Sequence, residues 1–103
     1  MIYELRTYHV LPRRMTAEVE IFEKVVPIFE KCGITVVGLW TTVIGRAQNF
    51  YYMLKYESLA DREKKWAKFI EDPDLAKLIQ GTDPISQYED NVILEPVPFS
   101  PLP

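Results

Sequence analysis

The chain has 103 residues, a formal net charge of −3 and a hydrophobic fraction of 48%, which favours one compact α+β domain over residues 1–103 and argues against disorder. The acidic balance and the absence of an arginine-rich stretch argue against nucleic-acid binding. Glu4 and Arg6 interrupt the segment where a signal peptide needs an apolar core, and no apolar run reaches the about 18 residues of a membrane span. We therefore expect a cytoplasmic protein with no membrane span.

The chain has one cysteine, Cys32, and one histidine, His9. These counts exclude an internal disulfide and argue against Ser-His-Asp triads, clustered zinc ligands and haem attachment within one chain. Cys32 falls on an apolar helical stripe, so we interpret it as a buried packing residue. We expect no metal site and no cofactor.

Residues 2–10 alternate between two kinds of side chain and predict a first strand. Glu4, Arg6 and Tyr8 share one side of it, and Leu5 lies on the other. If Leu5 and its neighbours face the helices, Glu4 and Arg6 face whatever covers the second side of the sheet. An ion pair in water on an edge strand is the alternative interpretation.

A helix is predicted from about Met15 or Thr16, with Thr16 as a possible N-cap. Pro27 lies inside its apolar pattern and cannot donate to a carbonyl, so we expect a kink or a restart there. Gly33 is the expected end of the helix.

Residues 34–57 predict two long strands around a turn at residues 45–49, with large or β-branched side chains on both faces. The two parities of the first of these strands are Val36, Trp40, Thr42 and Ile44, against Thr35, Val37, Leu39, Thr41 and Val43. An antiparallel sheet with one wet face alternates apolar and polar residues instead. The chain's own helices can cover one face only, so we expect a second copy of the chain to cover the other.

A second helix is predicted to start at a capping box at Ser58 and to stop at Asp72-Pro73. A short helix is expected over about residues 74–80, a connection over residues 83–90, and a last strand over residues 91–95. Four prolines in the final eight residues predict an extended Pro-rich C-terminal arm at 96–103.

The predicted order β-α-β-β-α-β is ferredoxin-like. Right-handed crossovers place both main helices on one face of an antiparallel sheet and make the first and third strands central. A wet opposite face forgoes the burial of about six large side chains at about 2 kcal/mol each. Two sheets packed face to face, as a homodimer of the dimeric α+β barrel type, recover that burial and leave a cavity between the sheet and its partner.

The chain resembles the NIPSNAP family in its short bacterial form along nearly its whole length. The matching residues are 3–8 (Tyr-Glu-Leu-Arg-Thr-Tyr), 37–41 (Val-Gly-Leu-Trp-Thr), Gly45, Asn49, 56–59 (Tyr-Glu-Ser-Leu), Arg62, Trp66 and Asp72-Pro73. The resemblance implies the fold and the dimer, since the family as a group has no settled reaction. Many members have a His-Leu-Trp run where this chain has Tyr52-Met53-Leu54, so no role of that histidine transfers.

Two functions are open from the sequence. The first is binding of a small molecule, anionic or aromatic, in a cavity whose predicted ligand-binding residues are Arg6, Tyr8, Trp40, Tyr52 and Tyr56. The second is a cofactor-free monooxygenase or isomerase, for which Glu4 and His9 are the candidate catalytic bases. A third interpretation makes the Pro-rich arm a contact for another protein.

Overall fold

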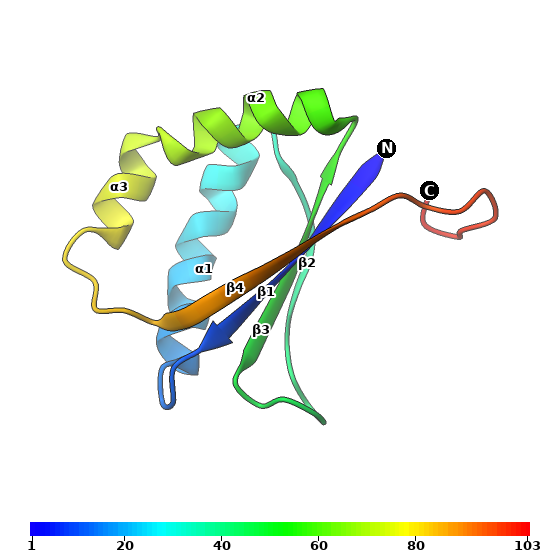
Figure 1. Cartoon of the computed structure of the whole chain (residues 1–103). Coiled ribbons are helices and arrows are strands. Elements are labelled where there is room, and N and C mark those ends of the chain that lie inside the picture. The colour runs from blue at the N-terminus through cyan, green and yellow to red at the C-terminus, as the bar shows by residue number, and fades with distance from the viewer.

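The protein, seen here as a computed structural model that describes all 103 residues, is a four-stranded antiparallel sheet with three helices against one face (Figure 1). The elements are β1 (Ile2–Val10), α1 (Met15–Lys31), β2 (Thr35–Thr41), β3 (Asn49–Tyr56), α2 (Leu59–Ile70), α3 (Pro73–Ile79) and β4 (Ser86–Leu94). The strand order β2-β3-β1-β4 confirms the ferredoxin-like arrangement with β1 and β3 at the centre. None of the helices is long and apolar enough to cross a bilayer.

Helix α1 runs without a break from Met15 to Lys31, so the restart expected at Pro27 does not occur. Pro27 lies on the exposed side of the helix, where water can bond the carbonyl that the proline leaves unpaired. The expected N-cap is also wrong, because the cap is Arg14 and no side chain bonds the first turn. Gly33 follows the helix with a φ of +82°, which explains why a glycine ends it.

The caps of α2 and α3 agree with their sequence signals. Ser58 Oγ accepts from the Asp61 amide at 3.1 Å, and Asp61 Oδ2 accepts from the Glu57 amide at 3.0 Å, which forms a reciprocal cap at the start of α2. Asp72 separates the two helices and caps α3, accepting from the amides of Asp74 and Leu75. These local bonds fix where the second helical layer turns.

A β-bulge in β2 changes the alternation expected from the sequence. Val36 pairs with Leu54 and Leu39 with Tyr52, while Gly38 pairs with Met53. Val36 and Leu39 therefore both pack against the core, although they differ in parity. Two-to-one pairing of this kind is what a bulge produces.

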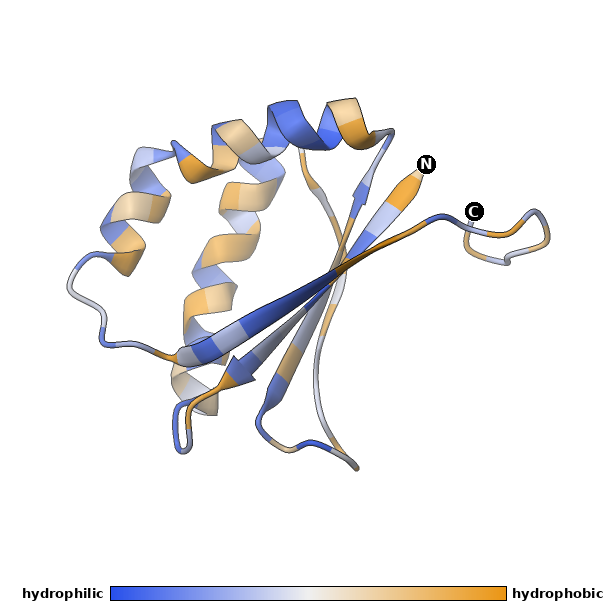
Figure 2. Cartoon of the chain, viewed as in Figure 1, coloured by the Kyte–Doolittle hydropathy of each residue, from blue (hydrophilic) through white to orange (hydrophobic).

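Strand β4 is longer than predicted, because residues 86–90 are not a connection but pair with β1. Their sequence, Ser-Gln-Tyr-Glu-Asp, has no alternation of apolar and polar residues. Backbone hydrogen bonds with the central strand β1 hold these residues in the sheet instead. Beyond β4 the chain projects from the body, and Figure 2 shows hydrophobic residues over the end of β4 and the arm. The hydroxyl of Tyr3 donates to the carbonyl of Pro103, which ties the arm's end back to β1.

The polar side of β1 faces the helices, which is the reverse of the expectation. Glu4 is 0% exposed and bonds Arg62 of α2, and Tyr8 packs edge-on against Phe22 of α1. Leu5 lies on the outer face of the sheet. Large side chains lie on both faces of β1 and β3, so apolar content alone does not determine which face packs against the helices. Arg62 on α2 determines it, because it is the partner that the buried carboxylate of Glu4 needs.

The outer face of the sheet is apolar over its middle. Cross-strand pairing joins Leu5 to Met53 and Val92, and Trp40 to Tyr51. Trp40 is 48% exposed and Val92 48% exposed. A Cβ on Gly38 would lie 2.6 Å from Trp40 Cζ2. Only glycine at position 38 therefore leaves room for the Trp40 indole to pack against the sheet.

An ion triad of buried Glu4, buried Arg6 and partly exposed Arg62 joins the sheet to α2. Glu4 Oε2 accepts from Arg6 Nη1 at 2.8 Å, and the carboxylate accepts from Arg62 Nε at 2.8 Å and Nη2 at 3.0 Å. Trp66 closes the triad, with Arg6 Cζ 4.6 Å from its ring centroid. Burial alone would raise the pKa of Glu4, but the bonds and charges of Arg62 and Arg6 outweigh it and hold that pKa below its ordinary value.

We predict that Glu4→Gln lowers the free energy of unfolding by about 3–5 kcal/mol at pH 7, because two arginines lose their carboxylate. Because the pKa of Glu4 is lower in the folded state than its ordinary value of 4.5, the charged carboxylate stabilises the fold at pH values above 4.5. This stabilisation is lost as the pH falls through the folded-state pKa. Urea denaturation at pH 7 and below pH 4 measures both effects. The exposed change Glu20→Gln is the control and should stay within about 0.5 kcal/mol of wild type. Equal stability of wild type and Glu4→Gln at pH 7 would contradict the role of the triad.

Candidate functional site

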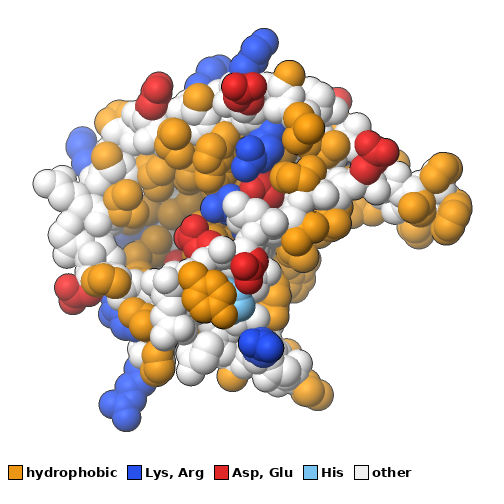
Figure 3. Space-filling model, in the orientation of Figure 1, with side chains coloured by type: hydrophobic (Ala, Val, Ile, Leu, Met, Phe, Trp, Pro, Cys, Tyr) orange, Lys and Arg blue, Asp and Glu red, His pale blue; other side chains and the backbone are white.

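A cavity of about 390 Å³ lies between the helix-facing side of the sheet and the helices α1 and α3. Figure 3 shows a hollow lined by hydrophobic side chains over this region. Ten of its 15 lining residues are hydrophobic, and its volume is within the range of about 300–1,000 Å³ typical of small-molecule sites. The cavity lies inside one chain, whereas the sequence led us to expect it between two sheets.

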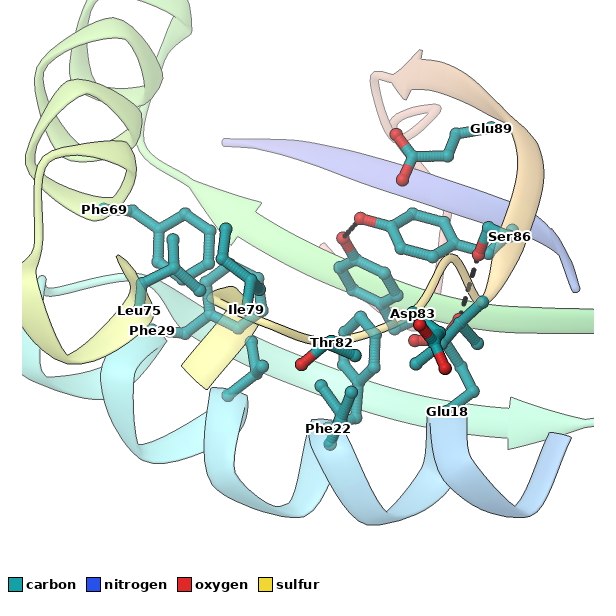
Figure 4. A pocket seen from close by; sticks show the side chains of 15 residues that line it. Glu18, Phe22, Phe29, Phe69, Leu75, Ile79, Thr82, Asp83, Ser86 and Glu89 are labelled. Atoms are coloured by element: carbon teal, nitrogen blue, oxygen red, sulfur yellow. Dashed lines mark hydrogen bonds between the residues drawn. The ribbon is translucent and has the colours of Figure 1, made fainter. Parts of the chain in front are cut away.

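Aromatic and aliphatic side chains from all three helices form the apolar wall. Phe22 and Phe29 come from α1, Phe69 from α2, and Leu75 and Ile79 from α3. In Figure 4 Phe69, Leu75 and Ile79 point toward the same space. Phe29 and Phe69 stack with ring centroids 4.2 Å apart, so this wall is held by packing between helices.

Two tyrosine hydroxyls lie on the sheet side of the cavity, where Ser86 and Glu89 of β4 are the other polar residues. Tyr8 and Tyr52 hydroxyl oxygens lie 2.7 Å apart, and Arg6 Nε donates to Tyr52 at 2.6 Å. Arg6 Nη2 lies 3.5 Å from the Tyr8 hydroxyl. Burial raises the pKa of both tyrosines above the ordinary range, so both hydroxyls are protonated at neutral pH. The pair can therefore donate and accept hydrogen bonds but does not supply an anion.

Glu18 is a buried carboxyl at the cavity and is only 4% exposed. Its Oε2 accepts from Ser86 Oγ at 2.9 Å, and Figure 4 shows this bond between two residues that line the cavity. Burial raises the pKa of Glu18, with Glu89 adding to the rise and Ser86 and Arg14 opposing it. A carboxyl of this kind can take up or release a proton nearer to neutral pH than an exposed one.

Glu18 is not among the candidate site residues identified from the sequence. The signal was its spacing: Glu18 precedes Phe22, Val25 and Phe29 by four, seven and eleven residues. Such spacing places all four on one helical face, and the structure buries that face. An acid on the buried stripe of a helix is a candidate functional residue.

The structure brings together three of the five predicted ligand-binding residues. Arg6, Tyr8 and Tyr52 form one hydrogen-bonded cluster, in which the tyrosines line the cavity and Arg6 lies behind them. Tyr56 is buried outside the cavity, near the ion triad, and its hydroxyl has no hydrogen-bond partner. Trp40 lies on the outer face, where it pairs with Tyr51. No single cavity in the chain holds all five.

Neither predicted catalytic base lines the cavity. Glu4 is held by two arginines and has no exposed surface. His9 lies on the outer face, stacked on Tyr88 with ring centroids 3.9 Å apart and with Nε2 2.7 Å from Asp90 Oδ2. No three histidine, cysteine, aspartate or glutamate side chains come together in metal-binding geometry.

Comparison with solved structures shows close similarity over the whole chain. A NIPSNAP family protein from Agrobacterium tumefaciens has a TM-score of 0.91 at 27% identity, covering 99% of this chain and 98% of that one. An uncharacterized NIPSNAP-like domain protein from Burkholderia xenovorans has a TM-score of 0.87 at 26% identity, covering 97% of this chain and 88% of that one. No curated protein matches the sequence.

A more distant similarity shows the fold alone. A putative antibiotic biosynthesis monooxygenase from Bordetella bronchiseptica has a TM-score of 0.72 at 15% identity, covering 93% of this chain and 96% of that one.

The family model described as NIPSNAP matches residues 3–101, nearly the whole chain. With this match and with NIPSNAP proteins among its structural neighbours, the chain belongs to the NIPSNAP family.

Proposed function

We propose that the protein is a homodimer in which each chain binds a small, mainly apolar molecule in the cavity between its sheet and its helices. The observation that supports binding is the cavity itself, whose ten hydrophobic lining residues include the two tyrosines with hydrogen-bonded hydroxyls. An apolar pocket with a few convergent polar groups is the usual form of a small-molecule site, because the apolar wall supplies affinity and the polar groups supply orientation.

Arg6 takes part in this proposal as a positioning residue and not as a direct anchor. Its Nη1 donates to Glu4, its Nε donates to Tyr52, and Nη2 lies 3.8 Å from Glu89 Oε1. It is 6% exposed and does not line the cavity. Arg6 therefore holds the tyrosines in place, and these contact the ligand.

The proposed dimer rests on the outer face of the sheet. Trp40, Leu5 and Val92 lie on a face that none of the helices covers (Figure 1). A patch of this kind on a soluble domain usually marks an interface. A two-fold pair of sheets is the simplest cover, because each copy brings the same apolar surface.

A cofactor-free isomerase is the second candidate, and Glu18 is the observation that favours it. Its carboxyl lines the cavity, bonds only Ser86, and has a raised pKa. Such a group can remove a proton from a bound carbon acid and return it to another carbon, which is all that an isomerase requires of a base. This places the proton transfer on Glu18 and not on Glu4 or His9.

The cavity can be tested by filling it. We predict that Ile79→Trp weakens binding of the neutral fluorescent probe N-phenyl-1-naphthylamine at least roughly tenfold, because an indole would occupy space that the probe needs. Ala76→Trp is the matched control on the same helix, since Ala76 is exposed and does not line the cavity. Fluorescence titration measures both variants. Equal affinity in wild type and Ile79→Trp, or no probe binding by wild type, would remove the proposal.

The dimer can be tested by placing a charge on the outer face. Sedimentation equilibrium should report a dimer at micromolar concentration for wild type and a monomer for Val92→Glu, because two-fold symmetry would bury two unpaired carboxylates. Ile70→Glu is the control, since Ile70 is a 60% exposed hydrophobic residue on α2, away from the sheet. A folded wild-type monomer at that concentration would contradict the dimer.

If the protein is an isomerase, it should convert a bicyclic β,γ-unsaturated ketone into its conjugated isomer. The increase in ultraviolet absorbance of the conjugated product measures the rate. The rate should rise with pH as Glu18 ionises, with a midpoint above the ordinary carboxyl range because burial raises its pKa. Glu18→Gln should lose the activity, and Glu20→Gln on the same helix should keep it. A rate that is the same in Glu18→Gln and wild type would exclude this role for Glu18.

A further inference from the structure

The hydrogen bonds around Tyr52 have only one consistent direction. The Tyr52 side chain is 1% exposed, and its hydroxyl bonds only Arg6 Nε and the Tyr8 hydroxyl. A guanidinium donates and never accepts, so Arg6 occupies an acceptor position on the Tyr52 oxygen. The Tyr52 proton then has one acceptor within reach, the oxygen of Tyr8. The reverse direction would leave a buried O–H donor without a partner.

This direction determines what Tyr8 offers to the cavity. The Tyr8 oxygen accepts from Tyr52 and faces a second donor in Arg6 Nη2, 3.5 Å away. Its own proton has no protein acceptor, and Tyr8 lines the cavity. The chain of hydrogen bonds from Arg6 through Tyr52 to Tyr8 thus ends in an O–H that is free to donate into the cavity and is polarised by the guanidinium behind it.

The charged residues that line the cavity limit which charge the ligand's head group can carry. Glu18, Asp83 and Glu89 line it, and no lysine or arginine does. An anionic head group would meet these carboxyls. A cationic head group would be attracted by these carboxyls, but it donates and does not accept, so it would leave the Tyr8 proton without a partner and lie near the Arg6 charge. A neutral oxygen acceptor avoids both conflicts and fills the one bond that Tyr8 leaves open.

We propose that the ligand is a neutral carbonyl compound with an aromatic or alicyclic body, whose carbonyl oxygen accepts a hydrogen bond from Tyr8. This inference rests on the proposed binding function of the same cavity. Of the two ligand classes expected from the sequence, anionic or aromatic, it keeps the aromatic one and sets aside the anionic one, because Arg6 is bonded to Glu4 and Tyr52 and does not line the cavity.

The experiment compares four probes that share a naphthalene body: 2-acetylnaphthalene, its alkene isostere 2-isopropenylnaphthalene, 2-naphthoate and 1-(2-naphthyl)ethylamine. Calorimetric titration of the 103-residue chain gives the affinity of each probe. We expect the ketone to bind more tightly than the carboxylate and the amine. We also expect the ratio of ketone to alkene affinity to fall roughly three- to tenfold in Tyr8→Phe, the size of one hydrogen bond.

Tyr56→Phe is the matched control, because it removes a buried hydroxyl that has no hydrogen-bond partner and lies outside the cavity. It should leave the ketone-to-alkene ratio unchanged. Binding of the alkene by Tyr8→Phe shows that the variant keeps its cavity. A ratio that is the same in wild type and Tyr8→Phe, or tighter binding of the carboxylate or the amine than of the ketone, would overturn the carbonyl assignment and leave the binding function intact. Failure of all four probes to bind would overturn the binding function itself.

Discussion

The carboxylate of Glu4 is the constraint on which the rest of the structure depends. It lies in the central strand, has no exposed surface, and requires a cation from a neighbouring element. Arg62 on α2 supplies that cation, and Arg6 supplies a second from the same strand. The triad therefore decides which side of β1 meets the helices, and it fixes α2 over the sheet. The same choice leaves the alternate residues of β1 on the outer face.

In this arrangement the cavity and the apolar outer face lie on opposite sides of the sheet, whereas from the sequence we expected the cavity at the dimer interface. The hydrogen-bonded side chains of Glu4, Arg6, Tyr8 and Tyr52 lie under the helices, while the outer face keeps the apolar pairs formed by Leu5, Met53 and Val92. The proposed ligand site and the proposed dimer interface are then on opposite sides of one sheet. A ligand can enter or leave the cavity without opening the proposed interface, because the cavity is walled by residues of a single chain.

The sequence predicted the element order, the central strands, the cap at Ser58 and the family, since each depends on local spacing or chain topology. It did not predict the direction of Glu4 and Arg6, because both faces of the central strands carry large side chains and a pattern of hydrophobicity cannot distinguish them. The bulge beside Gly38 needs pairing geometry that one strand does not contain. The first half of β4 is polar, so only its hydrogen bonds with β1 identify it as a strand.

The cluster around Arg6 is closed at one end and open at the other, and this follows from counting its donors and acceptors. Glu4 accepts from both arginines, so that end of the cluster has no bond to offer. Tyr52 is filled by Arg6 and Tyr8. Only the Tyr8 proton remains, and it lies against the apolar cavity, where water would compete less than at the surface. In the proposed complex, the buried charge of Arg6 would act on the ligand through two hydroxyls, because in a low dielectric each hydrogen bond in the chain strengthens the next.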